Sequence, residues 1–518
     1  MTTTKQPNIL LLMADQLAAP ALPIYGHKVV KAPHLEALAR TAAVFDNAYC
    51  NFPICAPSRA SLLTGRLPTS FELFDNGSEF PASLPTLPHY LKLLGYSTSL
   101  VGKMHFVGPD QLHGFEDRPV TEIYPADFNW TPDWTEGPTN RPSGVSLRGV
   151  TESGPCRRSL QIDYDEETES HAHQKLWDLA RAPERQPFFL TVSFSHPHSP
   201  FTAPQEHWDR YSHDDIDMPL VPTIPLEQLD EASRWIYYHH ARDQHTITDE
   251  HVRNARHAYY AMISYIDDKV GRIMHTLKEA GLDDDTVVIF TSDHGEMMGE
   301  RGMWYKQTFF EWSARVPLIV RIPNKASTTV SRVVSLVDLF PTVLELAANG
   351  CSPEVEVVDP LDGHSLTPLI DGKDEKWADT AICEYTDMGV IMPCRMLRHG
   401  RYKYIYTHRY PAQLYDLQID PNELIDLSGQ EGYREIEREL QSRVLCNWDP
   451  EDVLARVLQS QKRRNVIKDM MQQSDRYPNW SHLARPEDAK RYVRGSVKAG
   501  GSMGTKARAR FPQFAPKN

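Results

Sequence analysis

NILLLMAD, at Asn8–Asp15, and DTVVIFTSDHG, at Asp285–Gly295, are short apolar runs that each end beside an acidic residue. A continuous apolar run of this length is typical of a strand that a parallel sheet buries on both faces. RQPFFLTVSFSHPH, at Arg185–His198, has the same form and ends in a histidine-rich turn. Between these runs the sequence has helical periodicity, most clearly in the amphipathic stretch Asn254–Gly281. Strands that alternate with helices in this way predict an α/β fold, a largely parallel sheet with helices on both faces.

Chemically active side chains stand where the predicted strands end. Asp15, Lys103, His198, Asp293 and His294 each follow an apolar run. Ligands of an open α/β sheet bind beyond the carboxyl ends of its strands. We therefore expect these five side chains to meet at one edge of the sheet and to form its site.

The pattern changes after about residue 374. TAICEY, RMLRHGRYKYIYT and AQLYDL are typical of short strands with hairpin spacing, and a helical pattern follows them as far as Arg464. We expect three parts: a main α/β domain at residues 1–375, a smaller antiparallel α+β subdomain at 376–488 and a basic tail at 489–518.

The 518 residues are 41% hydrophobic and 24% charged, a balance that excludes a mostly disordered chain. The net charge of −14 has two parts, because residues 489–518 hold eight Lys or Arg and no acid, while residues 1–488 carry 47 basic and 69 acidic side chains. An acidic body argues against a nucleic-acid partner. No run approaches ~18 apolar residues, so no membrane partner is expected. Seven cysteines without disulfide or zinc spacing, and no signal segment at the N-terminus, predict a cytoplasmic protein in a reducing compartment.

The most specific motif surrounds Cys55. Cys55-Ala-Pro57-Ser58-Arg59 is followed by LTGR at residues 63–66, and together the two pieces resemble the signature of the formylglycine-dependent, or type I, sulfatases. In that family a formylglycine-generating enzyme oxidises the cysteine to the aldehyde Cα-formylglycine. The resemblance covers nearly the whole chain. It implies an alkaline-phosphatase-like fold and the hydrolysis of a small-molecule sulfate ester.

The chemistry of such an enzyme explains the residue types. A hydrated aldehyde has two hydroxyls: one attacks sulfur, and the other then loses a proton, expels sulfate and restores the aldehyde, a release that serine could not make. Pro57 favours a helix start, which allows residue 55 to lie at the positive end of the helix dipole. Arg59 lies one turn further on and is expected to stabilise the attacking oxygen.

The resemblance also implies a metal site. Asp15, Asp293 and His294 match the family's ligand positions, and the modified Cys55 would supply a further oxygen. Oxygen ligands favour Ca²⁺, whereas an imidazole points towards Mn²⁺, so one divalent cation of either kind is expected. Asp15 is followed by Gln16, and Asp293 by His294. This pattern resembles that of the family branch which contains choline sulfatases and phosphonate monoester hydrolases.

Four further residues match the family's sulfate-binding positions. Lys103, in GKMH, would neutralise a sulfate oxygen, and His105 would take the proton of the second hydroxyl. His198, in FSHPHSPF, and Lys306, in GMWYKQTFFE, would polarise the bridging oxygen of the ester and help the alcohol leave.

GKMHFVGPDQLHGFEDR, IYPADFNWTPDW and FDNGSEF resemble choline sulfatases more closely than the aryl or glycosaminoglycan enzymes, and imply choline sulfate as the substrate. A quaternary ammonium needs an aromatic face and a nearby acid. Trp130 and Glu384 match these two needs, and Asn76 would contact the sulfate or metal side. The chain departs from choline sulfatases in two places, because Glu136–Pro155 has no aromatic residue and the tail is basic where theirs brings an acid.

Several readings stay open on the same residues. An arylsulfatase and a phosphonate monoester or phosphodiester hydrolase would use the same scaffold, although phosphonate enzymes have a threonine-rich element where this chain has GKMHF. A third reading is a non-catalytic binding protein in which Cys55 stays unmodified. The resemblance also implies a homo-oligomer, a dimer or tetramer joined through exchanged C-terminal tails.

Overall fold

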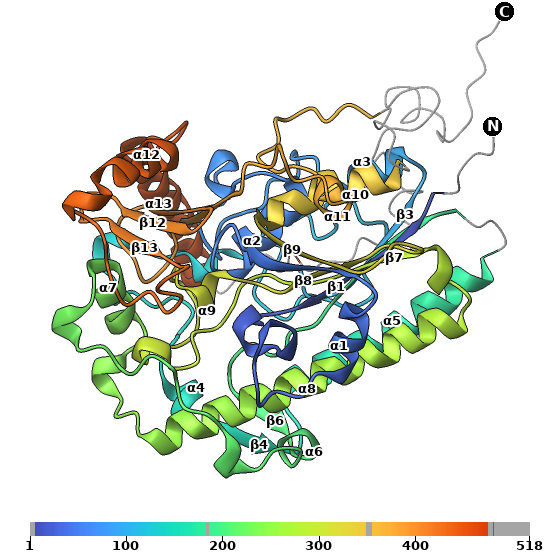
Figure 1. Cartoon of the computed structure of the whole chain (residues 1–518), viewed down its shortest axis with the longest axis horizontal. Helices are drawn as coiled ribbons and strands as arrows, with labels where there is room; N and C mark the ends of the chain where they lie inside the picture. The colour runs from blue at the N-terminus through green and yellow to red at the C-terminus, as the bar shows by residue number, and fades with distance from the viewer. Residues whose placement is uncertain (1–5, 183–185, 349–354, 475–479, 481–518) are drawn as a thin grey trace, which may run out of the picture. The chain divides into compact units, whose positions relative to one another are not determined.

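The computed structural model describes residues 6–182, 186–348, 355–474 and 480. Its central element is a seven-stranded sheet in which the strands NILLLMA and TVVIFTS lie side by side (Figure 1). The order of strands is β3 (Ser97–Gly102), β5 (Phe188–Ser193), β1 (Asn8–Ala14), β7 (Thr286–Ser292), β8 (Leu318–Arg321), β2 (Ala43–Tyr49) and β9 (Thr328–Ser335). β3, β5, β1 and β7 are parallel neighbours, whereas β8 runs antiparallel to β7 and β2. The carboxyl ends of the four parallel strands therefore share one edge.

The strand β1 shows why its sequence has no polar residue after Asn8. Ile9, Leu11 and Met13 belong to one hydrophobic cluster, while the residues between them, with Ala14, belong to a second cluster on the opposite face. All of these side chains are buried. Because full burial of one large aliphatic side chain stabilises the fold by about 1.5–3 kcal/mol, a strand with helices on both sides selects apolar residues at every position.

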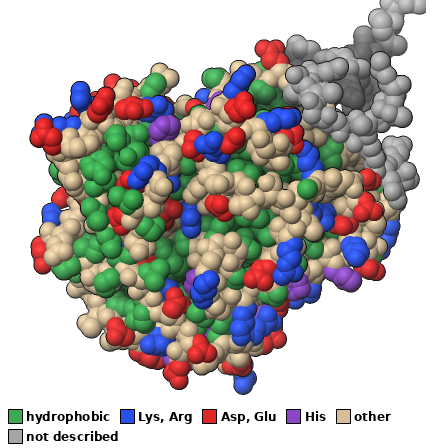
Figure 2. Space-filling view, viewed as in Figure 1, with side chains coloured by type: hydrophobic (Ala, Val, Ile, Leu, Met, Phe, Trp, Pro, Cys, Tyr) green, Lys and Arg blue, Asp and Glu red, His purple; other side chains and the backbone are tan. Residues whose placement is uncertain are grey.

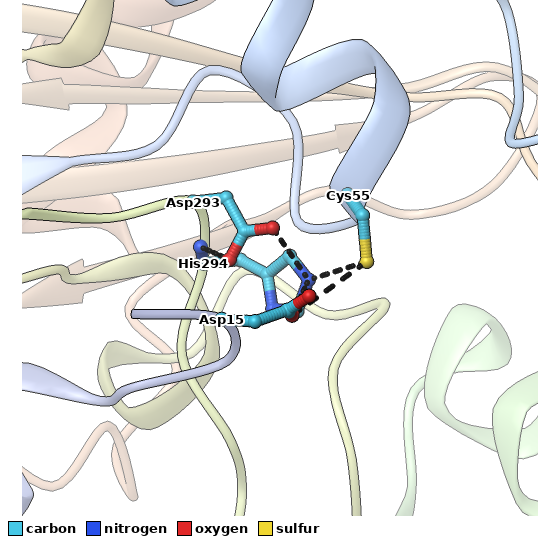
Figure 3. A group of neighbouring side chains, drawn as sticks. All are labelled: Asp15, Cys55, Asp293 and His294. Carbon is cyan, nitrogen blue, oxygen red and sulfur yellow. Dashed lines mark hydrogen bonds and ion pairs between the residues drawn. The ribbon is translucent and has the colours of Figure 1, made fainter. Parts of the chain in front are cut away.

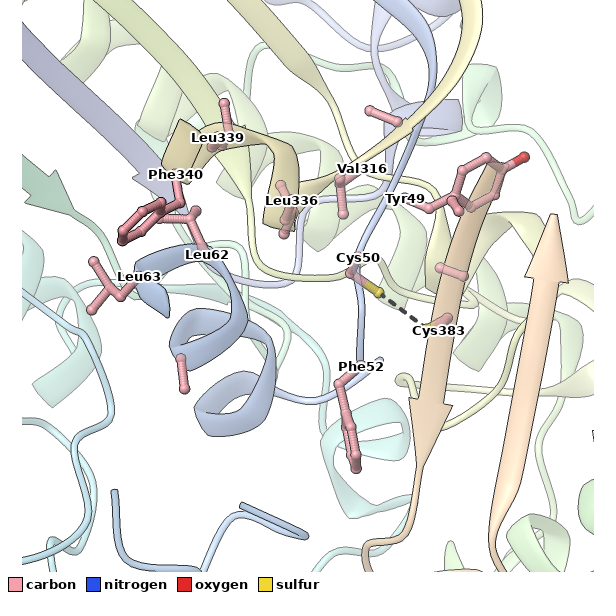
Figure 4. Close-up of a cluster of buried hydrophobic side chains, with 14 of the residues drawn as sticks. Tyr49, Cys50, Phe52, Leu62, Leu63, Val316, Leu336, Leu339, Phe340 and Cys383 are labelled. Carbon is pink, nitrogen blue, oxygen red and sulfur yellow. Dashed lines mark hydrogen bonds between the residues drawn. The ribbon is translucent and has the colours of Figure 1, made fainter. Parts of the chain in front are cut away.

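Helices cover both faces of the sheet (Figure 1). α2, α3 and α10 pack together over one face, and α1, α5 and α8 over the other. Leu62 and Leu63 of α2 lie beside Phe340 of α10 within the first cluster (Figure 4). The helices up to residue 370 are α1 (Pro33–Ala39), α2 (Cys55–Thr64), α3 (Leu87–Leu93), α4 (Arg148–Thr151), α5 (Leu160–Arg181), α6 (Gln205–Trp208), α7 (Glu231–His239), α8 (Asp249–Glu279), α9 (Glu311–Ala314), α10 (Leu339–Ala347) and α11 (Thr367–Ile370).

A separate antiparallel sheet follows in the chain. Its strands, in spatial order, are β10 (Thr380–Tyr385), β11 (Cys394–His399), β12 (Tyr402–Thr407) and β13 (Gln413–Asp416). α12 (Arg434–Val444) packs on β11 and β12 through Leu440 and Val444. α13 (Pro450–Ser474) then returns to contact the short turn η4 (Phe128–Trp130). Two three-residue strands, β4 (Gly154–Cys156) and β6 (Thr202–Pro204), form a small third sheet.

The predicted architecture, a mostly parallel sheet between helices with a smaller antiparallel sheet near the C-terminus, is confirmed. The helix α5 was not predicted, because it is rich in charged residues and buries few large apolar ones. The chain divides into the units Met1–Pro478 and Asn479–Asn518. The boundary at residue 375 stays a prediction, and the predicted basic tail lies outside the described residues.

The surface carries charges of both signs. Figure 2 shows acidic and basic side chains interspersed on one face, with hydrophobic side chains between them. Within the described part of the chain, no helix is long and apolar enough to cross a bilayer. Six of the seven cysteines are described, and all six are free.

Candidate active site

Cys55 is the first residue of α2. The extended Ile54 precedes it, and every residue of the helix is buried, so packing fixes the helix start. The backbone N–H of Ala56 donates to Asn76 Oδ1 at 2.9 Å, which satisfies one of the free N–H groups of the first turn. Burial raises the pKa of the Cys55 thiol to about 12. The unmodified thiol therefore lacks the low pKa that marks cysteines reactive as thiolates.

Three side chains from strand ends surround the Cys55 thiol (Figure 3). Asp15 follows β1, and Asp293 and His294 follow β7, its parallel neighbour. His294 Nε2 lies 3.3 Å from Cys55 Sγ, 3.9 Å from Asp15 Oδ1 and 3.8 Å from Asp293 Oδ2. Atoms bound at about 2.2 Å to one ion lie about 3.1–3.7 Å apart. One of the three distances lies inside this range and the other two lie just above it, so the four buried donors need only a small adjustment to hold one divalent cation, which their chemistry fits.

Arg59 and Lys103 balance the two carboxylates. Arg59 Nε donates to Asp293 Oδ2 at 2.7 Å, and Lys103 Nζ pairs with Asp15 Oδ2. Burial alone would raise the pKa of Asp293, but Arg59 holds it well below its usual range. Lys103 Nζ also lies 3.6 Å from Cys55 Sγ, and burial lowers the pKa of Lys103 to about 7. An anion beside residue 55 would therefore meet nearby cationic donors.

The end of β3 delivers Lys103 and His105. At Gly102 the backbone φ is +101°, and a Cβ would lie 2.1 Å from the carbonyl oxygen of Ser193, so only glycine allows this close approach of β3 and β5. His105 is 2% exposed, and neither of its ring nitrogens has a hydrogen-bond partner. Burial lowers the pKa of His105 to about 3. A buried neutral imidazole without partners can accept a proton from a bound ligand.

His198 and Lys306 form a second polar pair. Lys306 Nζ donates to His198 Nε2 at 2.6 Å and also to Gln16 Oε1. Gln16 Nε2 donates in turn to the buried carboxylate of Glu296. Burial lowers the pKa of His198 well below its usual range, so its ring is neutral and can accept from the ammonium of Lys306.

A cavity of about 610 Å³ leads to this pair. Its wall includes Ile54, Asn76, Trp130, His198 and Lys306. Sites for small molecules usually measure about 300–1,000 Å³. The ring of Trp130 meets the ring of His105 edge-on, with 5.5 Å between centroids. The structure therefore brings nine of the twelve predicted side chains together around Cys55, and Trp130 and Asn76 line the cavity that leads to them.

Glu384 lies in different surroundings. Its carboxylate accepts hydrogen bonds from the N–H and the hydroxyl of Thr69, at 3.0 and 2.8 Å, and pairs with Arg395 at 3.3 Å. It lines another cavity, beside Trp448. The structure therefore does not bring Glu384 to Trp130. Among the described residues that line the cavity of Trp130, Glu152 is the one that carries a carboxylate.

Besides Gln16 and Glu296, two residues of the loop after β3 belong to the site and had no predicted role. Glu122 accepts hydrogen bonds from the backbone N–H groups of Met104 and His105 and from Arg118. Tyr124 lies against Lys103 and His105. Both residues belong to the long loop after β3, where sequence spacing carries no signal because the contacts form only after the loop folds back over the strand ends.

Two family models match the chain. Residues 7–349 match the model described as sulfatase, and residues 299–448 match the one described as N-sulphoglucosamine sulphohydrolase, C-terminal. The first match spans more than half of the chain. The site described above contains the motif around Cys55 that resembles the signature of this family. The protein belongs to the sulfatase family and is a sulfatase hydrolase.

Individual relatives agree with this assignment. The choline-sulfatase of Rhizobium meliloti (strain 1021) is 41% identical over 504 residues, which cover 96% of this chain and 97% of that protein. The arylsulfatase of Clostridium perfringens (strain 13 / Type A) is 28% identical over 460 residues, 83% of this chain and 92% of that protein. The crystal structure of the phosphonate monoester hydrolase of Agrobacterium radiobacter aligns with a TM-score of 0.66 and 27% identity over 85% of this chain and 95% of that one. The predicted alkaline-phosphatase-like sulfatase fold and the resemblance to choline sulfatase are confirmed.

Proposed function

We propose that this sulfatase hydrolyses an alkyl sulfate monoester, choline sulfate, to choline and sulfate, after a formylglycine-generating enzyme has converted Cys55 to Cα-formylglycine. The observation that carries the proposal is the position of Cys55 at the start of α2, with Sγ 3.3 Å from His294 Nε2 and 3.6 Å from Lys103 Nζ. In this arrangement Sγ stands in for one hydroxyl of the aldehyde hydrate. The high identity to a choline-sulfatase supports the choice of ester.

The proposed metal ligands are Asp15, Asp293, His294 and the modified residue 55, and the cation is Ca²⁺ or Mn²⁺. When bound, such an ion lowers the pKa of an oxygen nucleophile and draws charge from a sulfate oxygen. Arg59, held by Asp293, stabilises the negative charge that develops on the oxygen of residue 55.

The remaining site residues act on the sulfate and the alcohol. Lys103 neutralises a sulfate oxygen, and His105 accepts the proton of the second hydroxyl when sulfate is expelled. His198 and Lys306 act on the bridging oxygen: the S–O bond breaks, its electron pair stays on the alcohol oxygen, and a proton passes there from the ammonium of Lys306. Trp130 offers its ring to the quaternary ammonium of choline.

A phosphonate monoester hydrolase is the second candidate. The observation that favours it is the likeness to the Agrobacterium radiobacter enzyme over 95% of that chain, together with a donor set in which an imidazole accompanies the two carboxylates. An arylsulfatase would use the same residues with a different alcohol. A homo-oligomer joined through the C-terminal tails and a cytoplasmic location stay predictions.

Two measurements test the proposal. The tryptic peptide that contains residue 55, taken from protein made in its native host, should be about 18 Da lighter than the unmodified peptide. On the same preparation, kcat/KM should be highest for choline sulfate when it is compared with p-nitrophenyl sulfate and a phenylphosphonate ester. An unmodified peptide would refute the formylglycine mechanism, and a preference for either of the other two esters would refute the choice of substrate.

A further inference from the structure

A second cavity, of about 520 Å³, shares no described lining residue with the cavity of Trp130. Its wall carries four cationic and four acidic side chains, besides His27. Its volume lies within the range of about 300–1,000 Å³ that is usual for small-molecule sites. The way in which these charges are paired determines which ligand the cavity can hold.

Two arginines of this wall are buried without a carboxylate partner. Arg398 and Arg301 are 6% and 8% exposed. Arg398 Nε donates to the hydroxyl of Tyr49 at 3.0 Å, and Arg301 Nη1 donates to the carbonyl oxygen of Glu423 at 2.7 Å. In the part of the chain that the structure describes, neither guanidinium forms an ion pair, and Arg398 Nη1 and Arg301 Nε have no hydrogen-bond partner. Because a buried charge without a partner is costly, an anion in the cavity would stabilise both side chains.

The two acids beside these arginines are already paired. Lys403 Nζ lies 2.7 Å from Glu311 Oε1 and 2.7 Å from Glu423 Oε1. Arg315 Nε lies 3.4 Å from Glu311 Oε2. Burial alone would raise the pKa of Glu311, but the surrounding cations, of which Lys403 has the largest effect, lower it to about 2, so this carboxylate is ionised. With the two arginines, the group has four cations for two carboxylates.

The other two acids of the wall have their own partners. Arg256 Nη2 lies 2.6 Å from Asp217 Oδ2, and Arg256 Nη1 lies 3.4 Å from Glu300 Oε1. Glu300 also accepts hydrogen bonds from the backbone N–H groups of Leu220 and Val221, at 3.0 and 2.8 Å. The charged side chains of the wall, counted with the cations that pair with its acids, therefore leave an excess of two positive charges, which one dianion would balance.

We propose that the second cavity is a binding site for an oxyanion, whose oxygens accept hydrogen bonds from Arg398 and Arg301. Sulfate, phosphate and carboxylate groups have this chemistry, because their oxygens match the N–H fork of a guanidinium. Tyr25, Trp312 and Leu417 also line the cavity, and they offer an apolar surface to an organic group attached to the anion. The site does not depend on the proposed sulfatase reaction.

Calorimetry tests the inference with inorganic phosphate and with phenylphosphonate, which has no ester bond to hydrolyse. In a chloride buffer, Arg398→Met should bind one phosphate ion fewer per chain than the unchanged protein, since any phosphate at the metal site contributes equally to both. Arg301→Met should give the same result. Arg438→Met is the matched control, because it removes an exposed arginine of α12, and it should bind like the unchanged protein. At the cavity site, a Kd for phenylphosphonate at least about tenfold below that for phosphate would identify an organic anion as the ligand, and equal values would identify an inorganic oxyanion.

Thermal unfolding gives a second readout. Without an oxyanion, Arg398→Met should unfold at the same temperature as the unchanged protein or at a higher one, because it removes a buried charge that has no carboxylate partner. Phosphate should raise the unfolding temperature of the unchanged protein and of Arg438→Met more than that of Arg398→Met. Equal phosphate binding by Arg398→Met and the unchanged protein would overturn the inference. So would a clear loss of stability of Arg398→Met in the absence of an oxyanion, since the arginine would then serve the fold alone.

Discussion

Replacing Arg464 with methionine should loosen the cavity wall that carries Trp130. Arg464, on α13, donates to the two carboxylate oxygens of Asp75 at 2.6 and 2.7 Å and to Thr131 Oγ1 at 3.1 Å. The side chains of this ion pair are 7% and 0% exposed. Thr131 directly follows Trp130, and Asp75 directly precedes Asn76. One guanidinium therefore holds two segments of the wall.

The size of the loss comes from the charges that Arg464 leaves behind. Burial and then the neighbouring Asp75 raise the pKa of Asp387 well above its usual range, whereas Arg464 lowers it. Without Arg464, the buried carboxyl groups of Asp75 and Asp387 would lose the positive charge of its guanidinium. Breaking a buried pair in this way costs about 3–5 kcal/mol of folding free energy.

The pH dependence of this loss has a definite sign. Removal of Arg464 raises the folded-state pKa of Asp387 further above its value in the unfolded chain. Below that folded-state pKa Asp387 holds a proton and the cost is partly relieved, and the cost returns as the pH rises through it. The variant should therefore be destabilised more at the higher of two pH values.

Thermal unfolding at these two pH values measures the effect. Arg464→Met should unfold at a lower temperature than the unchanged protein, with the larger difference at the higher pH, and should raise KM for choline sulfate. Arg463→Met, on the exposed side of the same helix, is the matched control. Adding Asp75→Asn to Arg464→Met should restore most of the stability. An unchanged unfolding temperature, or a double variant as unstable as the single one, would refute the argument from uncompensated charge.

Four further outcomes follow from the site. A chelator should abolish sulfate release and lower the unfolding temperature, and Ca²⁺ or Mn²⁺ should restore both, since an ion at about 1,000 times its Kd stabilises the folded state by about 4 kcal/mol. Cys55→Ala should release no sulfate while its circular dichroism and unfolding temperature stay close to those of the unchanged protein. Glu122→Gln should lower kcat at least about tenfold in a sulfate-release assay, because the backbone of His105 loses a charged acceptor. Glu152→Gln should raise KM for choline sulfate several-fold but not for the uncharged analogue in which carbon replaces nitrogen, whereas Glu384→Gln should not discriminate between the two substrates.

The sheet and the donors around Cys55 could be predicted because their signals are local. A run such as NILLLMA is apolar at each position after Asn8, which is typical of a strand buried on both faces, and the residue after such a strand lies at the edge of the sheet. β7 pairs with β1 in parallel register from Asn8 and Thr286 onward. Asp15 and Asp293 consequently arrive side by side, whatever the loops between them do.

The parts that could not be predicted depend on contacts between distant segments. α5 has no broad apolar stripe because it meets α8 partly through ion pairs, such as Glu169 with Lys269 at 2.6 Å. From its position in the sequence, Glu384 was predicted to lie near the cation of the substrate. In the fold, Thr69 and Arg395 satisfy its carboxylate. Thr69 is far from Glu384 in the chain. Arg395 lies opposite Glu384 only when β10 and β11 pair in the observed register, which the hairpin spacing alone does not fix.

The residues expected to bind metal and sulfate and the residues of the cavity wall come from different parts of the fold, which explains how one scaffold can serve different esters. The groups expected to bind metal and sulfate come from strand ends and the start of α2, which the core holds rigidly. The wall expected to face the alcohol comes from the segments around Trp130 and Ser143–Glu152, and α13 holds the first of these through Arg464 and Gln461. The wall can therefore change without moving the donors. The chain is similar to relatives named for choline, aryl and phosphonate esters, and we expect the segment at residues 136–155, where this chain lacks aromatic residues, to determine its own choice of alcohol.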